Sequence, residues 1–135
     1  MTNSEIYDEA REKFFNFLLK KPCTSKQARE YLSRNKIPDG YKKILMTEAK
    51  DMGLIDDLTF ARLFIDGHLH WGNAKIIYEL GARGVAREEI YSALDDAPDE
   101  NERARELYES WQKTGLPHKK IINRLLSRGF SHLGS

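Results

Sequence analysis

One short helical phrase occurs three times in the sequence, and this repetition limits the folds that the chain can adopt. In each copy, a leucine precedes an apolar residue by five positions, with a turn position just before the apolar residue. The pairs are Leu32 and Ile37, Leu80 and Val85, and Leu125 and Phe130, with Lys36, Gly84 and Gly129 at the turn position. The leucines are 48 and 45 residues apart. Because periods of this length are typical of stacked helical units, we predict a tandem repeat.

Each phrase also has a purely local explanation as the end of a helix. Gly84 and Gly129 can adopt positive φ angles without steric cost, as helix stops require. Arg83 and Arg128 stand just before them, where a cation stabilises the negative end of the helix dipole by about 0.3–1 kcal/mol. Capping explains any one of the phrases taken by itself. The matching order of helices around all three phrases favours the repeat.

The fold class predicted from periodicity is all-α. Apolar residues recur three and four positions apart, and no segment alternates as a strand would. Helices are predicted over residues 4–20, 26–35, 39–52, 57–69, 74–83, 86–94, 100–113 and 118–128, with Ser4 and Asp57 as N-caps. The last letters, FSHLGS, are too few for a ninth helix. We expect an elongated, curved array of three-helix repeats over residues 1–55, 56–97 and 98–135, the third incomplete at its C-terminus.

Composition narrows the class of protein. The chain has 135 residues, and a hydrophobic fraction of 40% is too high for a disordered chain. A single cysteine, Cys23, excludes an intramolecular disulfide and a cysteine-based metal site, and we expect it to be buried. No apolar stretch approaches the roughly 18 residues of a membrane span, and the polar start MTNSEIYDEAREK lacks the features of a signal peptide. We therefore expect a cytoplasmic location.

Motifs of catalysis and cofactor binding are not found in the sequence. It has no Walker or dinucleotide glycine loop, no His-Glu-x-x-His and no nucleophile elbow. His68 and His70, if helical, point about 200° apart, which makes a poor metal pair. Asp56 and Asp57 precede a helix and are interpreted as capping residues. We expect a protein that is not an enzyme and that has no cofactor.

The cations provide the candidate binding surface. Net charge is +3 over residues 1–55, −4 over 56–97 and +2 over 98–135. In a stacked array, equivalent helices fall on one side, so their cations are expected to share an edge. The alternative is that exposed helix faces are simply charged. The candidate partner- or DNA-binding residues are Lys20, Lys21, Lys26, Arg29, Arg34, Lys36, Arg83, Arg87, Lys119, Lys120, Arg124 and Arg128.

The stretches GLIDDLTFARLF and GNAKIIYELGARGV carry a resemblance to a known family. The sequence resembles the RecX-type regulatory proteins, modulators of the RecA recombinase, over nearly its whole length. The matching residues are Gly53, Leu54, Ile55, Asp56, Asp57, Phe60, Ala61, Phe64, Gly72, Ile76, Leu80, Gly84 and Val85. Where that family commonly has arginines, this chain has His68, His70 and Trp71, which weakens the expected cationic character of the middle unit.

The resemblance implies a curved, all-helical, non-enzymatic protein that acts in DNA repair, recombination and the SOS response. Such proteins bind RecA in the groove of its filament on single-stranded DNA, and they suppress its recombinase, ATPase and LexA-cleavage functions. A monomer without membrane contact is expected. Two alternatives stay open. The stretch TSKQAREYLSRNKIPDGYKKIL fits a helix-turn-helix that binds DNA directly, and the whole chain fits a helical scaffold for another protein.

Overall fold

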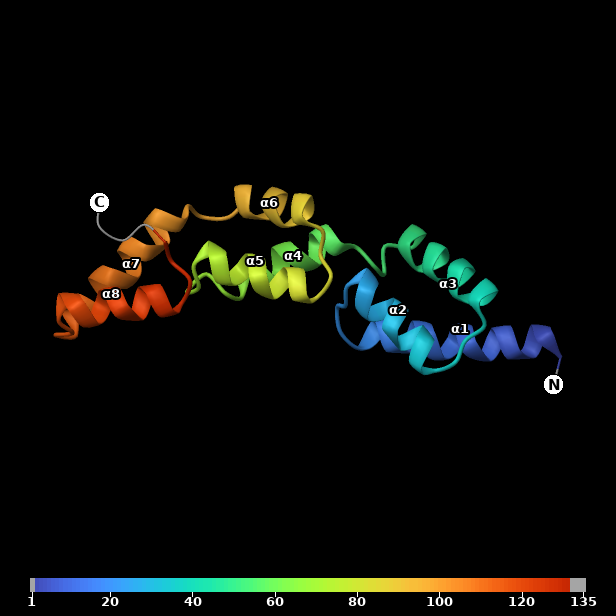
Figure 1. Ribbon diagram of the computed structural model, residues 1–135. Helices are drawn as coiled ribbons and strands as arrows, with labels where there is room; N and C mark the ends of the chain where they lie inside the picture. The colour runs from blue at the N-terminus through green and yellow to red at the C-terminus, as the bar shows by residue number, and fades with distance from the viewer. Residues whose placement is uncertain (1, 132–135) are drawn as a thin grey trace.

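The computed structural model describes residues 2–131, and within them the protein is an elongated row of helices (Figure 1). The prediction of an all-α fold is confirmed. The helices are α1 (Asn3–Lys20), α2 (Ser25–Arg34), α3 (Asp39–Asp51), α4 (Asp57–Asp66), α5 (Asn73–Ala82), α6 (Arg87–Asp95), α7 (Glu100–Lys113) and α8 (His118–Ser127). None of these helices is long and apolar enough to cross a membrane. The expectation that no ninth helix follows falls mainly on residues 132–135, outside the described residues.

Two predicted N-caps were wrong by one or two residues. Thr2, not Ser4, caps α1, and its hydroxyl accepts a hydrogen bond from the amide of Glu5 at 3.2 Å. Asp56, not Asp57, caps α4, because Asp56 has the extended backbone that lets its carboxylate accept from the amide of Thr59. Asp57 is therefore free to reach another helix.

Helix α4 ends earlier than periodicity predicted. The helix stops at Asp66, although the apolar pattern continues to Leu69. Residues 67–72 form a turn instead, and α5 begins at Asn73. Periodicity could not show this, because a turn that tucks Leu69 against the core keeps the same apolar spacing.

The three repeated phrases form one backbone motif. Lys36, Gly84 and Gly129 all have positive φ angles, of 56°, 92° and 91°. After each of them, the next amide donates to the carbonyl of the leucine five residues before. These bonds run from Ile37 to Leu32 at 3.1 Å, from Val85 to Leu80 at 3.1 Å and from Phe130 to Leu125 at 3.2 Å. This is the bond of a Schellman stop, in which a left-handed residue ends the helix.

Buried side chains gather in three clusters along the row. The first extends from Ala10 to Ile55, the second from Ala61 to Ala93 and the third from Ala104 to Phe130. Cys23 is buried in the first cluster, as expected. The division into three repeats stays a prediction, and three separate hydrophobic clusters support it.

The row is joined by a contact that occurs twice, in which a helix start packs on a helix stop. At the start of α2, the Thr24 hydroxyl donates to the carbonyl of Arg83 at 2.6 Å. At the start of α5, the amide of Gly72 donates to the carbonyl of Arg128 at 2.8 Å. Arg83 and Arg128 end α5 and α8. The start of α2 therefore packs on the end of α5, and the start of α5 packs on the end of α8 (Figure 1).

A carboxylate completes each of these joints. Asp57, the first residue of α4, accepts from the amide of Ser25 at 2.8 Å. Glu100, the first residue of α7, accepts from the amide of Asn73 at 2.6 Å. Both amides belong to the first residue of a helix, where the backbone has no intrahelical partner and the dipole favours a negative charge. The two joints therefore use the same chemistry at equivalent positions.

We predict that Gly84→Ala destabilises the protein more than Gly53→Ala does. Both glycines have positive φ, which costs an alanine about 1–2 kcal/mol. A Cβ at Gly53 meets open space, whereas a Cβ at Gly84 overlaps the Cβ of Lys26 across the joint. The added overlap is expected to cost about 1–3 kcal/mol more. Urea unfolding followed by circular dichroism measures both losses, and equal losses contradict the joint.

Candidate cationic–aromatic interface

The turn between α4 and α5 carries a stack of aromatic rings. The His68 ring lies 4.1 Å from that of Phe64 and 4.3 Å from that of Trp71, measured between centroids. The Nδ1 of His68 lies 2.6 Å from the carbonyl oxygen of Phe64. Because a carbonyl only accepts, Nδ1 carries the proton and donates, which fixes the orientation of the ring.

Four cations lie over the aromatic rings of this region. Lys75 places its Nζ 4.3 Å from the centre of the Trp71 ring. Arg83 lies 4.9 Å above Phe64, with one guanidinium nitrogen also paired to Glu79 at 2.8 Å. On the third unit, Arg124 and Arg128 both lie 4.9 Å from the ring of Trp111. Each such contact contributes about 0.5–1 kcal/mol at an exposed site and orients the cation.

The second joint brings the two aromatic groups together. The Gly72 amide binds the Arg128 carbonyl, and a Cβ at Gly129 would lie only 2.7 Å from the Cβ of Lys75. The His70 ring lies 5.9 Å from that of Trp71, measured between centroids. Its pKa is lowered by partial burial, and further by the positive charges of Arg128, His68 and Lys75. We call the set the cationic–aromatic surface, made of Phe64, His68, His70, Trp71, Lys75, Arg83, Trp111, Arg124 and Arg128.

The structure brings only part of the predicted cation set to this surface. Arg83, Arg124 and Arg128 belong to it, and Lys26 lies beside it, with its Nζ 3.4 Å from the carbonyl oxygen of Ala82. The other eight are exposed on α1, α2, α6, α8 and the connecting segments: Lys20, Lys21, Arg29, Arg34, Lys36, Arg87, Lys119 and Lys120. Their role as binding residues stays a prediction.

Sequence reasoning missed the aromatic half of the surface. The resemblance treats His68, His70 and Trp71 only as a loss of arginines, and periodicity places His68 near the end of a helix, with His70 just after it. They lie in the turn instead, with ring centroids 6.0 Å apart. The spacing of Phe64, His68 and Trp71, at intervals of four and three residues, was the signal that could have shown one shared face.

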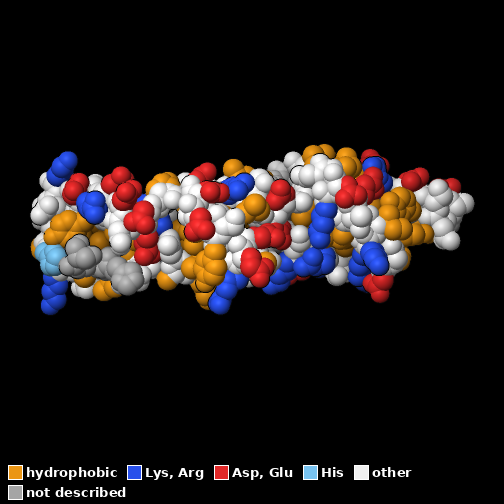
Figure 2. All heavy atoms as spheres, turned by 90° about the horizontal axis from the view of Figure 1, so that it is seen from above, with side chains coloured by type: hydrophobic (Ala, Val, Ile, Leu, Met, Phe, Trp, Pro, Cys, Tyr) orange, Lys and Arg blue, Asp and Glu red, His pale blue; other side chains and the backbone are white. Residues whose placement is uncertain are grey.

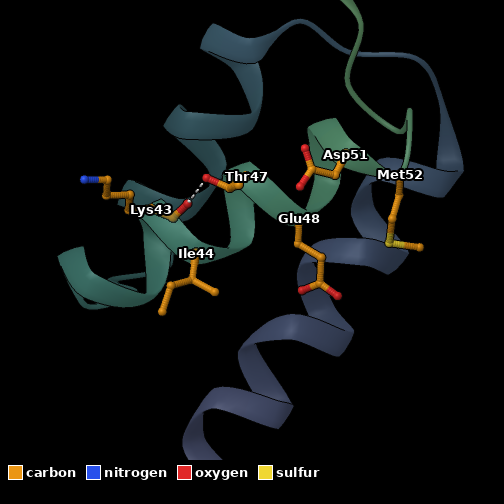
Figure 3. Close-up of a pocket in the computed structure, with 6 residues that line it drawn as sticks. All are labelled: Lys43, Ile44, Thr47, Glu48, Asp51 and Met52. Carbon is orange, nitrogen blue, oxygen red and sulfur yellow. Dashed lines mark hydrogen bonds between the residues drawn. The ribbon is translucent and has the colours of Figure 1, made fainter.

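Two other surfaces were compared with this one. The view from above Figure 1, where α6 lies uppermost, shows acidic side chains spread over the middle of the row (Figure 2). A hollow on the outside of α3 is lined by six residues: Lys43, Ile44, Thr47, Glu48, Asp51 and Met52 (Figure 3). Within residues 2–131, no group of three or more His, Cys, Asp or Glu side chains is placed to hold a metal ion.

The fold and this surface define the class of protein: an all-α row of helices with a surface of cations and aromatic rings. No protein-family model matches the sequence. It is 27% identical to the regulatory protein RecX of Thermobifida fusca, over 94% of this chain and 75% of that protein. It is 29% identical to the regulatory protein RecX of Lactobacillus delbrueckii subsp. bulgaricus, over 83% of this chain and 38% of that protein.

Solved structures share the fold. The crystal structure of RecX from Lactobacillus salivarius superposes with a TM-score of 0.79 at 20% identity, covering 96% of this chain and 91% of that one. A second structure of a regulatory protein RecX gives a TM-score of 0.74 at 19% identity, covering 93% and 68%. The sequence is similar to the RecX regulatory proteins, and the fold is that of the solved RecX structures.

We predict that Arg128→Gln raises the pKa of His70. A neighbouring positive charge disfavours the imidazolium form, so removal of the Arg128 charge makes His70 easier to protonate. An NMR titration of the imidazole resonances measures this pKa. Arg62→Gln is the matched control, because Arg62 pairs with Asp96 instead. A His70 pKa that stays the same in Arg128→Gln contradicts the arrangement of the surface.

Proposed function

We propose that the chain is a non-enzymatic regulator that binds RecA and its filament on single-stranded DNA. In this proposal it inhibits the recombinase, ATPase and coprotease activities of RecA, acting as a monomer. The observation that supports this most is the cationic–aromatic surface, which spans the second joint and draws on four helices and a turn. The names of the RecX relatives support a regulatory role.

The shape of the chain suits a filament as a partner. A rigid row of helices presents side chains at intervals, so several weak contacts to successive protomers act together as one strong interaction. The surface cations suit an acidic protein surface or the phosphates of the strand, and the exposed parts of the aromatic rings suit unstacked bases. A chain bound across neighbouring protomers hinders filament extension and the subunit motions of ATP turnover.

The test is a titration of RecA ATPase activity on single-stranded DNA. We expect the chain to lower the ATPase rate, and Arg124→Gln with Arg128→Gln to raise the half-inhibitory concentration by about tenfold, the effect of about 1.4 kcal/mol of lost binding. The matched control is Lys43→Gln with Arg62→Gln, which removes two charges from α3 and α4. An ATPase rate that stays constant at saturating protein contradicts the proposal.

The alternative function is direct DNA binding without RecA, and the same surface supports it. Bases stack on exposed aromatic rings, and each phosphate contact makes affinity fall by about one further power of salt concentration. Fluorescence anisotropy with labelled single strands and duplexes over a range of salt separates the two functions. Tight, salt-sensitive duplex binding in the absence of RecA favours the alternative, and filament-dependent binding favours the regulator.

A further inference from the structure

The turn that carries the aromatic stack is held by a buried arginine of the neighbouring unit. Arg103 lies on α7 and is 4% exposed, and it is the only charged side chain that is buried within residues 2–131. Burial lowers the pKa of its guanidinium, while Glu100 and Asp99 oppose that shift. A cation in such a place needs hydrogen-bond partners for its donors, because an unpaired buried charge costs several kcal/mol.

Those partners belong mainly to the turn. The Nη1 of Arg103 donates to the carbonyls of Leu69, at 3.3 Å, and Trp71. Its Nη2 donates to the Oδ1 of Asn73, and its Nε donates to the carbonyl of Pro98 at 2.9 Å. Leu69 and Trp71 lie between α4 and α5, where a carbonyl has no partner in a helix. One guanidinium therefore ties the second half of the turn and the start of α5 to α7.

The first joint has no such tie at the equivalent place. Counted from the carboxylates that open α4 and α7, Phe60 occupies the position of Arg103. The segment before α2 is short, residues 21–24, and Phe60 packs against the second hydrophobic cluster instead. The segment before α5, residues 67–72, is longer and has carbonyls that need donors. Arg103 thus serves the turn of the aromatic stack and is not a general feature of the repeat.

We infer that Arg103 is a positioning residue for the interface: it sets the turn that presents Trp71 and His68 to the partner. The part of this inference that concerns filament binding rests on the proposed function. It means that the third unit controls the aromatic part of the middle unit's surface. Lysine cannot replace Arg103 in this role, because a single ammonium does not form the planar fork that bonds three carbonyls and an amide.

The experiment compares Arg103→Lys with the parent in a Trp111→Phe background, where Trp71 is the single tryptophan. Acrylamide quenching of its fluorescence reports the exposure of Trp71. We expect Arg103→Lys to raise the quenching constant in this background. With Trp111 in place, we expect Arg103→Lys to weaken filament binding by about tenfold, as loss of an orienting partner typically does. Asn73→Ala removes one partner of the fork and is the milder variant, expected to change both quantities in the same direction.

Ile90→Val is the matched control for stability. Ile90 is buried in the second cluster on α6, and removing one methyl group there lowers the stability of the fold without touching the fork. If Ile90→Val weakens filament binding as much as Arg103→Lys at the same folded fraction, Arg103 is only structural and the inference is overturned. Unchanged Trp71 quenching in both Arg103→Lys and Asn73→Ala overturns it as well. If the unmutated chain, with Trp111 in place, does not bind filaments, the proposed function fails, and quenching still decides the role of Arg103.

Discussion

The structure depends on one contact, the start of a helix packed on the stop of an equivalent helix farther along the chain. A helix start has free amides and a positive dipole end, and a helix stop has free carbonyls and a negative end. Placed together, each satisfies the other, as the bonds from Thr24 to Arg83 and from Gly72 to Arg128 show. The carboxylates of Asp57 and Glu100 accept hydrogen bonds from the first amides of α2 and α5. Three small hydrophobic clusters are thus joined by polar contacts of a single kind.

The same contact builds the candidate interface. Because the Gly72 amide binds the end of α8, the turn that precedes α5 must lie beside Arg128. The turn that carries Trp71 and the end of α8 at Arg128 therefore meet at the second joint, although they lie far apart in the sequence. At the first joint, the segment before α2 is too short to present such a stack. The interface is a consequence of how the units join and of one longer turn.

Sequence periodicity predicted the all-α fold and the positions of the stops, because both are local. The leucine, the left-handed position and the apolar residue after it lie within six residues of one another, as at Leu80 to Val85. Periodicity could not predict the partners across the joints. Asp57 was interpreted as a cap of its own helix, yet it caps a helix 32 residues earlier. The burial of Arg103 also had no local signal, since three of its four partners lie about 30 residues earlier in the chain.

Two constraints determine which residue stands at each of the three repeated helix stops: the positive φ angle and the space for a side chain. Lys36, Gly84 and Gly129 share a positive φ, so backbone conformation alone does not require glycine. Lys36 is exposed, and its side chain extends into solvent. At the other two stops a Cβ would overlap Lys26 or come within 2.7 Å of Lys75, so the neighbouring helix excludes any side chain. At Gly84 and Gly129, glycine therefore marks a place where another helix approaches closely, whereas Gly53 ends a helix with open space beside it.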